Sequence, residues 1–504
     1  MSNWQIACLV AYSLIVVSLS LYGLHRYHML RLFFRHRRKR LTAHDHFEEL
    51  PAVTVQLPMY NEFHVVERLL DAVAGIDYPR DRFQVQVLDD SQDDTRARAR
   101  NAAQRLAATG LDIEYVNRDS RVGYKAGALA AGLGRASGEF VLILDADFVP
   151  NPDILQRSIH FFTDPGIGMV QMRWGHLNRT HSLLTRIQSI FLDGHFVIEH
   201  TARNGSGRFF NFNGTAGIWR KSAIETAGGW QHDTLTEDLD LSYRAQLKGW
   251  KFLFLPDVEI PGEVPVEMNA FKLQQHRWTK GAVQTAKKIL PRVWRSPVPL
   301  QVKVEATFHL TGHFSYVLML LMSLLTLPVL HIRTQLGWER MLIVDLPLFS
   351  LATMALSGFY ITSQRVLYKH WKRQIKYLPM LMALGMGMCI NNARAVLEAL
   401  VGHQSSFRRT PKYGVTAGSG SQQRLSQLRQ RYAGNTSFLL TTFELFMACY
   451  FLLALHQAWS TQLYLALPFL LLFQIGFAYS STMSLLQPLA VPPWLWPTRW
   501  RLAA

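Results

Sequence analysis

Short apolar stretches alternate with amphipathic ones between residues 52 and 260. The apolar stretches are rich in Val, Ile and Leu and have the length of buried strands. They lie at 52–58, 84–88, 113–117 and 140–144. The stretches between them have helical spacing and lie at 62–76, 95–108 and 125–135. This alternation predicts an α/β domain with a largely parallel sheet, which binds ligands at the carboxyl ends of its strands.

Long uncharged stretches predict helices that span a membrane. The first, residues 4–24, is followed by residues 25–40, which hold seven Lys and Arg and no acid. Because the charge follows the apolar core, we expect an uncleaved anchor with its N-terminus outside, not a signal peptide. Four more stretches of spanning length lie at 307–330, 341–363, 436–455 and 461–486.

Basic loops predict the orientation of these spans. The loop 364–376 holds five basic residues and no acid, so we expect it in the cytoplasm. The apolar part of residues 377–401 is short, and a span there would put the basic loop 402–435 outside. We therefore expect an interfacial or re-entrant helix at 377–401 and five spans in total. Glu444, deep in one span, predicts either a polar path or a hydrogen-bonded structural acid.

The pattern divides the chain into five parts. The expected division is an anchor at 1–30, a cytoplasmic α/β domain at 45–265, interfacial helices at 266–300, a membrane region at 301–486 and a tail at 487–504.

Composition excludes several classes of protein. The 504 residues are 49% hydrophobic and 18% charged, which is too apolar for a disordered chain. The net charge of +17 would favour binding to nucleic acid. Much of the basic excess, however, flanks apolar stretches, as in membrane proteins. The three cysteines, Cys8, Cys389 and Cys449, have no metal-ligand spacing and exclude a disulfide framework. No phosphate-binding glycine motif follows the first strand, which argues against a P-loop ATPase.

Acidic motifs follow two of the predicted strands. Asp89-Asp90 ends one strand, and Asp145-Ala146-Asp147 ends another. Two carboxylates one residue apart suit Mg²⁺ or Mn²⁺, which prefer oxygen ligands and often keep substrate phosphates. Lys125, which has small residues beside it, could approach such phosphates.

Two further motifs lie nearer the membrane spans. The stretch 236–240, Thr-Glu-Asp-Leu-Asp, begins a predicted helix. One interpretation is structural: Thr236 is the N-cap and the acids interact favourably with the helix dipole. The other is functional: Asp238 is a general base. In Gln274-x-x-Arg277-Trp278, the arginine could hold a diphosphate and the tryptophan could stack on a sugar ring. The structural alternative is an interfacial helix anchored by these two residues.

The order of these motifs resembles the processive family 2 glycosyltransferases, which include cellulose, mannan and hyaluronan synthases. The sequence looks most similar to the cellulose-synthase-like mannan and glucomannan synthases at 212–220, 227–230, 247–252 and 274–278. The resemblance implies a GT-A-like nucleotide-sugar-binding domain inserted between transmembrane helices. The stretch 407–412 partly resembles a gating loop, with Arg409 where that loop has Val.

The resemblance also implies roles for individual residues. Asp238 would be the catalytic base with Glu237 beside it, and Asp145 and Asp147 would contact the metal and the nucleotide. The substrate-binding residues would be Asp89 or Asp90 at the base or ribose, and Lys125 and Arg277 at the diphosphate. Trp278 would stack on the acceptor sugar, Asn213 and Gly214 would lie beside the acceptor, and Gln274 would also bind substrate.

We therefore expect a membrane-embedded inverting β-glycosyltransferase that uses Mg²⁺ or Mn²⁺. It would polymerise sugar from UDP-glucose or GDP-mannose into a β-1,4-glucan or a mannan-type polysaccharide and pass the growing glycan across the bilayer. The alternative is transfer of one sugar to a lipid, such as a polyprenyl phosphate or ceramide. A non-catalytic transporter or scaffold would not need the aligned acids.

The expected location is a bacterial inner membrane, or a Golgi membrane in a eukaryote. We expect a multi-pass protein with its catalytic domain in the cytoplasm and no nucleic-acid partner. Five spans are few for a polymer conduit, so a homodimer or an accessory subunit could complete it.

Overall fold

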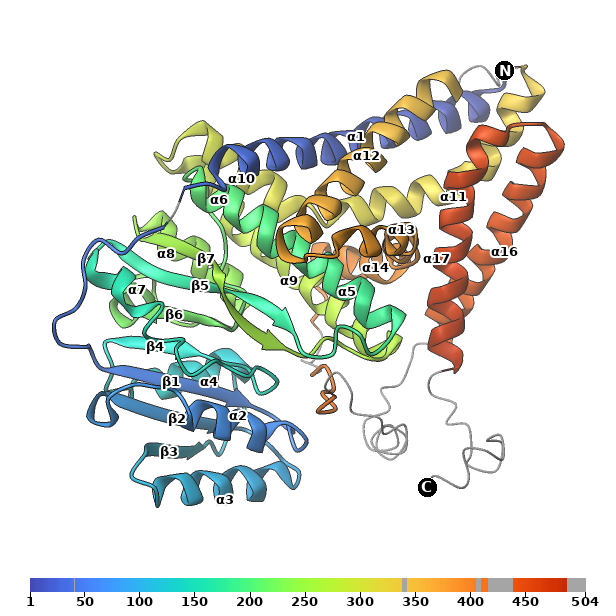
Figure 1. Ribbon diagram of the computed structural model, residues 1–504. Coiled ribbons are helices and arrows are strands. Elements are labelled where there is room, and N and C mark those ends of the chain that lie inside the picture. Colours follow the sequence, from blue (N-terminus) through green and yellow to red (C-terminus); the bar gives the residue numbers. More distant parts are fainter. Residues whose placement is uncertain (40, 338–341, 405–408, 416–437, 487–504) are drawn as a thin grey trace, which may run out of the picture.

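The computed structural model describes residues 1–39, 41–337, 342–404, 409–415 and 438–486. The predicted tail 487–504 lies outside the described residues, as does most of the predicted loop 402–435. A sheet with helices packed on it occupies one end of the molecule, and long helices occupy the other (Figure 1). The α/β domain and the apolar helices that the sequence predicts are therefore both present.

Seven strands form one mixed sheet in the order β3-β2-β1-β4-β6-β5-β7. The pairs among β1, β2, β3 and β4 are parallel, whereas β6 runs antiparallel to both β4 and β5. The predicted α/β fold is confirmed, with β6 as the reversed strand. The strands are β1 Val53–Met59, β2 Phe83–Asp89, β3 Asp112–Asn117, β4 Phe140–Ile143, β5 Ile167–His176, β6 Gly217–Arg220 and β7 Lys251–Gly262.

Helices follow the first strands in turn and cover both faces of the sheet. All seven residues of β1 are buried, as expected for a strand covered on both sides. The helices of this domain are α2 Val66–Ala74, α3 Thr95–Ala107, α4 Tyr124–Leu133, α5 Leu183–Gly194, α6 Thr201–Gly205, α7 Lys221–Thr226 and α8 Glu237–Leu247. A π-helical segment, His195–His200, joins α5 to α6.

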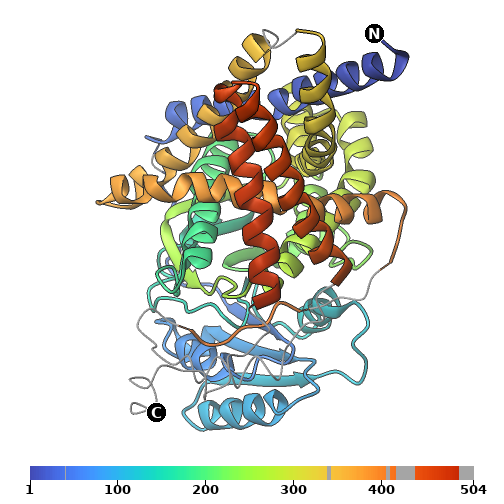
Figure 2. The same cartoon turned by 90° about the vertical axis from the view of Figure 1, so that its right-hand side faces the viewer.

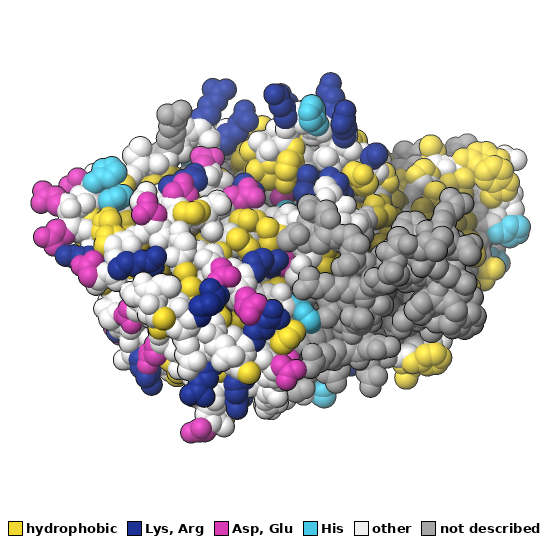
Figure 3. All heavy atoms as spheres, turned by 60° about the horizontal axis from the view of Figure 1, so that its bottom comes forward, with side chains coloured by type: hydrophobic (Ala, Val, Ile, Leu, Met, Phe, Trp, Pro, Cys, Tyr) yellow, Lys and Arg dark blue, Asp and Glu magenta, His cyan; other side chains and the backbone are white. Residues whose placement is uncertain are grey.

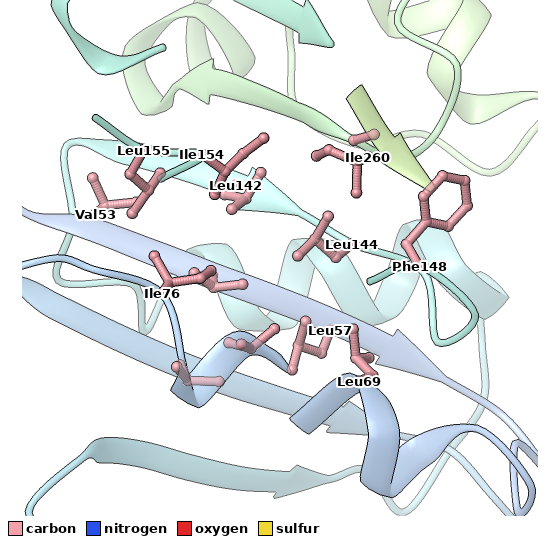
Figure 4. Close-up of a cluster of buried hydrophobic side chains, with 14 of the residues drawn as sticks. Val53, Leu57, Leu69, Ile76, Leu142, Leu144, Phe148, Ile154, Leu155 and Ile260 are labelled. Atoms are coloured by element: carbon pink, nitrogen blue, oxygen red, sulfur yellow. The ribbon is translucent and has the colours of Figure 1, made fainter. Parts of the chain in front are cut away.

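One hydrophobic core lies between the sheet and α2. Figure 4 shows Val53 and Leu57 of β1, Leu69 of α2 and Leu142 of β4 pointing into the same space, with Ile260 of β7 beside them. Burying one such side chain stabilises the fold by about 1.5–3 kcal/mol. This core holds the parallel strands in register, so it also sets where their carboxyl ends meet.

Four helices are long and apolar enough to cross a membrane among the described residues, and one bent pair would make a fifth. The four are α1 Asn3–His36, α11 Phe314–Gln335, α16 Phe438–Ser460 and the segment Tyr464–Leu486, which contains α17 Leu467–Leu486. The bent pair joins Trp371–Gly387 to Cys389–Leu400 at 41°, as a broken span or a re-entrant segment. By length and composition, these helices are those of a multi-pass membrane protein.

Two predicted spans correspond to helices with somewhat different bounds. The stretch 341–363 corresponds to α12, Leu342–Leu367, whose 26 residues are about 39 Å long. This length is enough to cross the hydrocarbon core of a bilayer, which is about 30 Å thick. The predicted span 307–330 is not one continuous helix, because α10 ends at Thr311 and α11 begins at Phe314. Gly312, a poor helix former, lies at this break.

The long helices pack closely on one another and on the α/β domain. In Figure 2, α16 and α17 lie side by side. α17 also packs on α13, where a Cβ added at Gly476 would clash with the carbonyl oxygen of Ala383. α9 contacts α8 of the α/β domain as well as α10, α14 and α17, so it links the domain to the membrane region. The bounds of these helices are α9 Met268–Arg295, α10 Leu300–Thr311, α13 Leu378–Gly387 and α14 Cys389–Leu400.

The surface differs between the α/β domain and the long helices. On the face viewed in Figure 3, charged side chains of both signs cover the α/β domain. Hydrophobic side chains gather at the opposite end, where the long helices lie. Exposed residues of α16 include Leu439, Leu452 and Leu453, which suits contact with lipid.

Candidate active site

The carboxyl ends of β1, β2 and β4 meet at one edge of the sheet, where a cleft opens. Met59 at the end of β1 pairs with Asp89, and Gln56 pairs with Ile143, so the residues after β2 and β4 reach the same edge. This sheet cleft has a volume of about 180 Å³. The predicted site residues that line it are Asp90, Lys125, Asp145, Asp147, Asn213, Gly214, Glu237, Asp238, Gln274, Arg277 and Trp278. Residues far apart in the sequence therefore converge on one site.

Asp89 does not line this cleft. Its carboxylate is fully buried and accepts hydrogen bonds from the Tyr115 hydroxyl and the Ser91 amide, both at 2.8 Å. Asp90 does line it, and Arg118 donates to both of its carboxylate oxygens. Of the two alternatives, only Asp90 is therefore positioned to meet a ligand in the cleft.

Asp145 and Asp147 each accept a hydrogen bond from a lysine. Lys125 Nζ lies 2.5 Å from Asp145 Oδ1 and also donates to the carbonyl of Gly214 at 2.8 Å. Lys412, from the loop after α14, donates to Asp147 Oδ2. Both carboxylates are therefore paired with a lysine, with which a bound cation would have to compete.

These carboxylates fit a hard divalent cation. Glu62 and Glu263 add two more carboxylates to the wall of the same cleft. The described residues contain no preformed group of three or more His, Cys, Asp or Glu side chains for a metal. Mg²⁺ and Mn²⁺ need only one or two carboxylates when substrate phosphates and water supply the other ligands. Asp145 and Asp147 are the residues that would hold such an ion.

Glu237 and Asp238 lie in the first turn of α8. Thr236, expected as the N-cap, makes no capping hydrogen bond; its hydroxyl lies 3.2 Å from that of Thr285 on α9. Burial, together with the charge of Glu237, raises the pKa of Asp238 to about 7. A carboxylate with this pKa is suited to accept a proton near neutral pH.

Gly214 packs directly against Asp238. It has φ of +81°, and a Cβ added there would lie 3.1 Å from Asp238 Oδ2 and 3.5 Å from Lys125 Nζ. Only glycine adopts this conformation without strain and leaves room for the carboxylate.

Arg277 brings positive charge to the cleft from α9. Burial lowers its pKa, while the charges of Glu237 and Asp145 act in the opposite direction. Since an arginine stays protonated in proteins, a guanidinium faces the carboxylates.

Several residues of the cleft wall were not predicted from the sequence. Arg409 pairs with Glu62, Nε to Oε1 at 2.9 Å, and burial raises the pKa of Glu62 to about 7. The Arg121 guanidinium lies 3.3 Å from the centre of the Tyr60 ring. Arg409 and Lys412 belong to the stretch that resembles a gating loop, but no sequence signal placed that stretch against Asp147.

A second, larger cavity begins where the sheet cleft ends. This deep cavity has a volume of about 590 Å³ and reaches Leu330 and Arg333 on α11 and Phe473 on α17. It therefore runs from the α/β domain into the membrane helices. The residues that line both cavities are Trp174, Leu192, Asn213, Thr236, Asp238 and Trp278. Asp238 thus lies where the two cavities meet.

Comparison with known proteins agrees with this architecture. Residues 51–281 match the family described as "Glycosyltransferase like family 2". The chain is 44% identical over 280 residues to glucomannan 4-beta-mannosyltransferase 2 of Arabidopsis thaliana, covering 53% of this chain and 52% of that protein. It is 45% identical over 251 residues to glucomannan 4-beta-mannosyltransferase 1 of Oryza sativa subsp. japonica, covering 49% and 48%. The chain thus spans about half the length of these curated relatives.

A solved structure has a similar fold. The mannosyltransferase PcManGT of Pyrobaculum calidifontis, in complex with GDP-Man and Mn²⁺, matches with a TM-score of 0.55 and 22% identity. The match covers 79% of this chain and all of that one.

The mixed α/β sheet, with an acidic cleft at its strand ends, has the GT-A-like fold of the solved mannosyltransferase. Residues 51–281 match the model of the family 2 glycosyltransferases, and the chain is similar in sequence to glucomannan 4-beta-mannosyltransferases.

Proposed function

We propose that this protein is a membrane-embedded inverting mannosyltransferase that polymerises mannose from GDP-mannose into a β-1,4-linked mannan-type polysaccharide. The mannosyl donor is supported by the names of the relatives, which are glucomannan 4-beta-mannosyltransferases. GDP-Man bound to a protein of the same fold adds support for the nucleotide.

The meeting of the two cavities at Asp238 is the observation that carries this proposal. A nucleotide sugar in the sheet cleft and an acceptor in the deep cavity would approach each other there. Holding two reactants in such an arrangement removes much of the entropic barrier to a bimolecular reaction.

The reaction is a single displacement. Asp238 removes the proton from an acceptor hydroxyl, and that oxygen attacks the anomeric carbon of the donor. The bond to the diphosphate breaks on the opposite face, and its electron pair leaves with the diphosphate. Because one displacement inverts the anomeric centre, an α-linked donor gives a β-linked product.

Positive side chains bind the leaving diphosphate. Lys125 and Arg277 line the sheet cleft near Asp145 and can stabilise the charge that develops as the bond breaks. A divalent cation, when bound by Asp145 and Asp147, would neutralise further charge on the diphosphate. The Mn²⁺ in PcManGT supports a divalent ion but does not choose between Mg²⁺ and Mn²⁺.

The deep cavity is the start of a route for the product across the membrane. Its extension to Arg333 on α11 and Phe473 on α17 supports this role. Residues 25–40, which follow the α1 span on the side of the domain, hold seven Lys and Arg. This excess supports a cytoplasmic α/β domain, and we propose an inner-membrane location.

A second candidate is transfer of one sugar to a lipid-linked acceptor. One observation favours it: the far part of the deep cavity is lined by apolar side chains such as Met322, Leu470 and Phe473. An isoprenoid chain would fit such a wall.

Product analysis tests the proposal. Membranes that contain the protein are incubated with Mn²⁺ and labelled GDP-mannose or UDP-glucose, and the product is sized and digested with β-mannanase. We expect a high-mass, mannanase-sensitive product from GDP-mannose. The Asp238→Asn variant should lose about 10²- to 10⁴-fold of the transfer rate but still bind donor. A single-sugar glycolipid would favour the second candidate, and near-normal transfer by Asp238→Asn would reject the base.

A further inference from the structure

Asn211 and Gln275 line the deep cavity, have no part in the reaction described above, and each carry an amide atom without a partner among the described residues. They are 8% and 5% exposed, so both are buried. Among the described residues, no group hydrogen-bonds to Asn211 Oδ1 or to Gln275 Nε2. Buried polar atoms without a partner cost free energy, so each needs a water molecule, a ligand or another functional reason.

Asn211 is placed in this wall by the alternation of the segment before β6. Phe210 and Phe212 belong to the hydrophobic core, whereas Asn211 and Asn213 line the deep cavity. Residues two apart in extended chain face the same side, which explains the pattern. The Asn211 amide nitrogen donates to the carbonyl of Phe212 at 3.0 Å, and this fixes Oδ1 as the unpaired atom.

Gln275 is placed there by one face of α9. Phe271, Gln275, Trp278 and Ala282 all line the deep cavity and recur at the spacing of a single helix face. Its neighbour Gln274 lines the sheet cleft and not the deep cavity. The two adjacent glutamines on α9 therefore line different cavities: Gln274 lines the sheet cleft and Gln275 lines the deep cavity.

Both amides lie one step beyond the point where the cavities meet. Asn213 and Trp278 line both cavities, whereas Asn211 and Gln275 line only the deep one. Gln275 precedes Trp278 by three residues, which is about 4.5 Å along the helix axis. A chain that begins at Trp278 and enters the deep cavity would next meet these two amides.

We propose that Asn211 and Gln275 form a binding site for hydroxyl groups of the acceptor saccharide, at the sugar unit behind the one that receives the new residue. The inference rests on the proposed function and names the acceptor as a saccharide chain.

The chemistry of the two amides matches a sugar. Asn211 offers a hydrogen-bond acceptor and Gln275 a donor, and a hydroxyl group can be both donor and acceptor. The terminal torsions of Asn and Gln are broad, so a small rotation aims either amide at a ligand. An isoprenoid chain at the same place would leave both atoms unpaired.

Equilibrium binding of β-1,4-mannotetraose and cellotetraose to the purified full-length protein tests this site without requiring turnover. The main variant is Gln275→Met, which keeps the size of the side chain and removes its polar groups. We expect the dissociation constant of the tetrasaccharide that the wild type binds to rise about tenfold, as for the loss of one hydrogen bond. Binding of GDP-mannose should change by less than twofold. Asn211→Ala should act in the same direction.

Thermal stability separates ligand binding from a structural role. Since the Gln275 nitrogen has no partner among the described residues, Gln275→Met should leave the melting temperature unchanged or raise it. Gln104→Met, on the exposed surface of α3, is the matched control and should change neither the tetrasaccharide affinity nor the melting temperature. Gln274→Met should weaken binding of GDP-mannose and leave tetrasaccharide binding unchanged.

The outcomes distinguish this inference from the proposed function. Unchanged tetrasaccharide binding in Gln275→Met would overturn the inference and mean that water alone solvates these amides. A wild type that binds polyprenyl phosphate but neither tetrasaccharide would also overturn it. If the wild type transfers no mannose, the proposed function fails, yet a tenfold loss of tetrasaccharide binding in Gln275→Met would still support the site.

Discussion

Lys272 on α9 and Glu444 on α16 form a buried ion pair, with Nζ 2.6 Å from Oε2. Lys272 also donates to the Ser484 hydroxyl on α17 at 2.7 Å, and Asn391 donates to the Lys272 carbonyl at 3.0 Å. Glu444 is not among the residues that line the sheet cleft or the deep cavity. Of the two alternatives for this acid, the structural one is observed. The pair holds the helix that carries Arg277 and Trp278 against the membrane helices.

Breaking this ion pair should destabilise the protein strongly. Glu444→Ala leaves the Lys272 ammonium buried without its counter-charge, which typically costs about 3–5 kcal/mol. The double variant Lys272→Met/Glu444→Leu removes both charges and should regain most of that stability. Thermal unfolding in detergent measures both effects. A double variant less stable than Glu444→Ala would show that the unpaired charge of Lys272 is not what destabilises the single variant.

The pH dependence of transfer should report Asp238. Only the deprotonated carboxylate accepts a proton, and its pKa is raised to about 7 by burial and by Glu237. Transfer, measured as kcat/KM, should therefore rise with pH up to about 7 and level off above it. Glu237→Gln removes a neighbouring negative charge and lowers the pKa of Asp238, so this limb should move to lower pH. A limb that stays in place, or moves up, would contradict the assignment.

Removing Lys412 should strengthen cation binding. Its ammonium pairs with Asp147, one of the two carboxylates proposed to hold the ion. Lys412→Ala frees that carboxylate. A competing pair worth at least about 1 kcal/mol, the value for an exposed pair, corresponds to Mn²⁺ binding that is tighter by about fivefold or more. Calorimetric titration with Mn²⁺ in the absence of donor measures this change. Asp147→Asn should nearly abolish binding, and weaker binding in Lys412→Ala would contradict a competing role.

Gly214 should be intolerant of a side chain for reasons beyond backbone strain. Gly214→Ala forces an alanine to a φ of +81°, which costs about 1–3 kcal/mol, and brings its Cβ against the Asp238 carboxylate. Gly207 has a similar φ of +68° with no atom within 4 Å, so Gly207→Ala is the matched control. Both variants should lose similar stability, but only Gly214→Ala should lose most of its transfer activity. Equal activities would show that the glycine is needed for the turn alone.

The first strands and helices could be predicted because their signal is local. The predicted strand 84–88 corresponds to Phe83–Asp89, and the predicted helix 95–108 corresponds to Thr95–Ala107. In both, the spacing of apolar side chains decides which face is buried. The direction of β6 could not be predicted, because a strand of four residues carries no signal for its partner.

The sequence predicted that the cleft would be acidic, but it did not identify all of the residues that line it. Asp145, Asp147 and Asp238 stand in recognisable motifs after a strand or at the start of a helix. Arg409 and Glu62 do not, and their pairing joins the loop after α14 to the residues after the first strand. Contacts at such separations depend on how whole elements pack, which no local pattern records.

The sequence by itself therefore determined the α/β class of the domain, its apolar helices and the residue types of its acidic cleft, because these follow from local periodicity and side-chain chemistry. Only the tertiary structure decided that Asp90 faces the cleft and Asp89 the core, and that Glu444 pairs with Lys272. It also decided that Asp238 lies between two cavities. Each depends on distances between elements that pack together only after the chain has folded, through burial and close contact that no single stretch of sequence encodes.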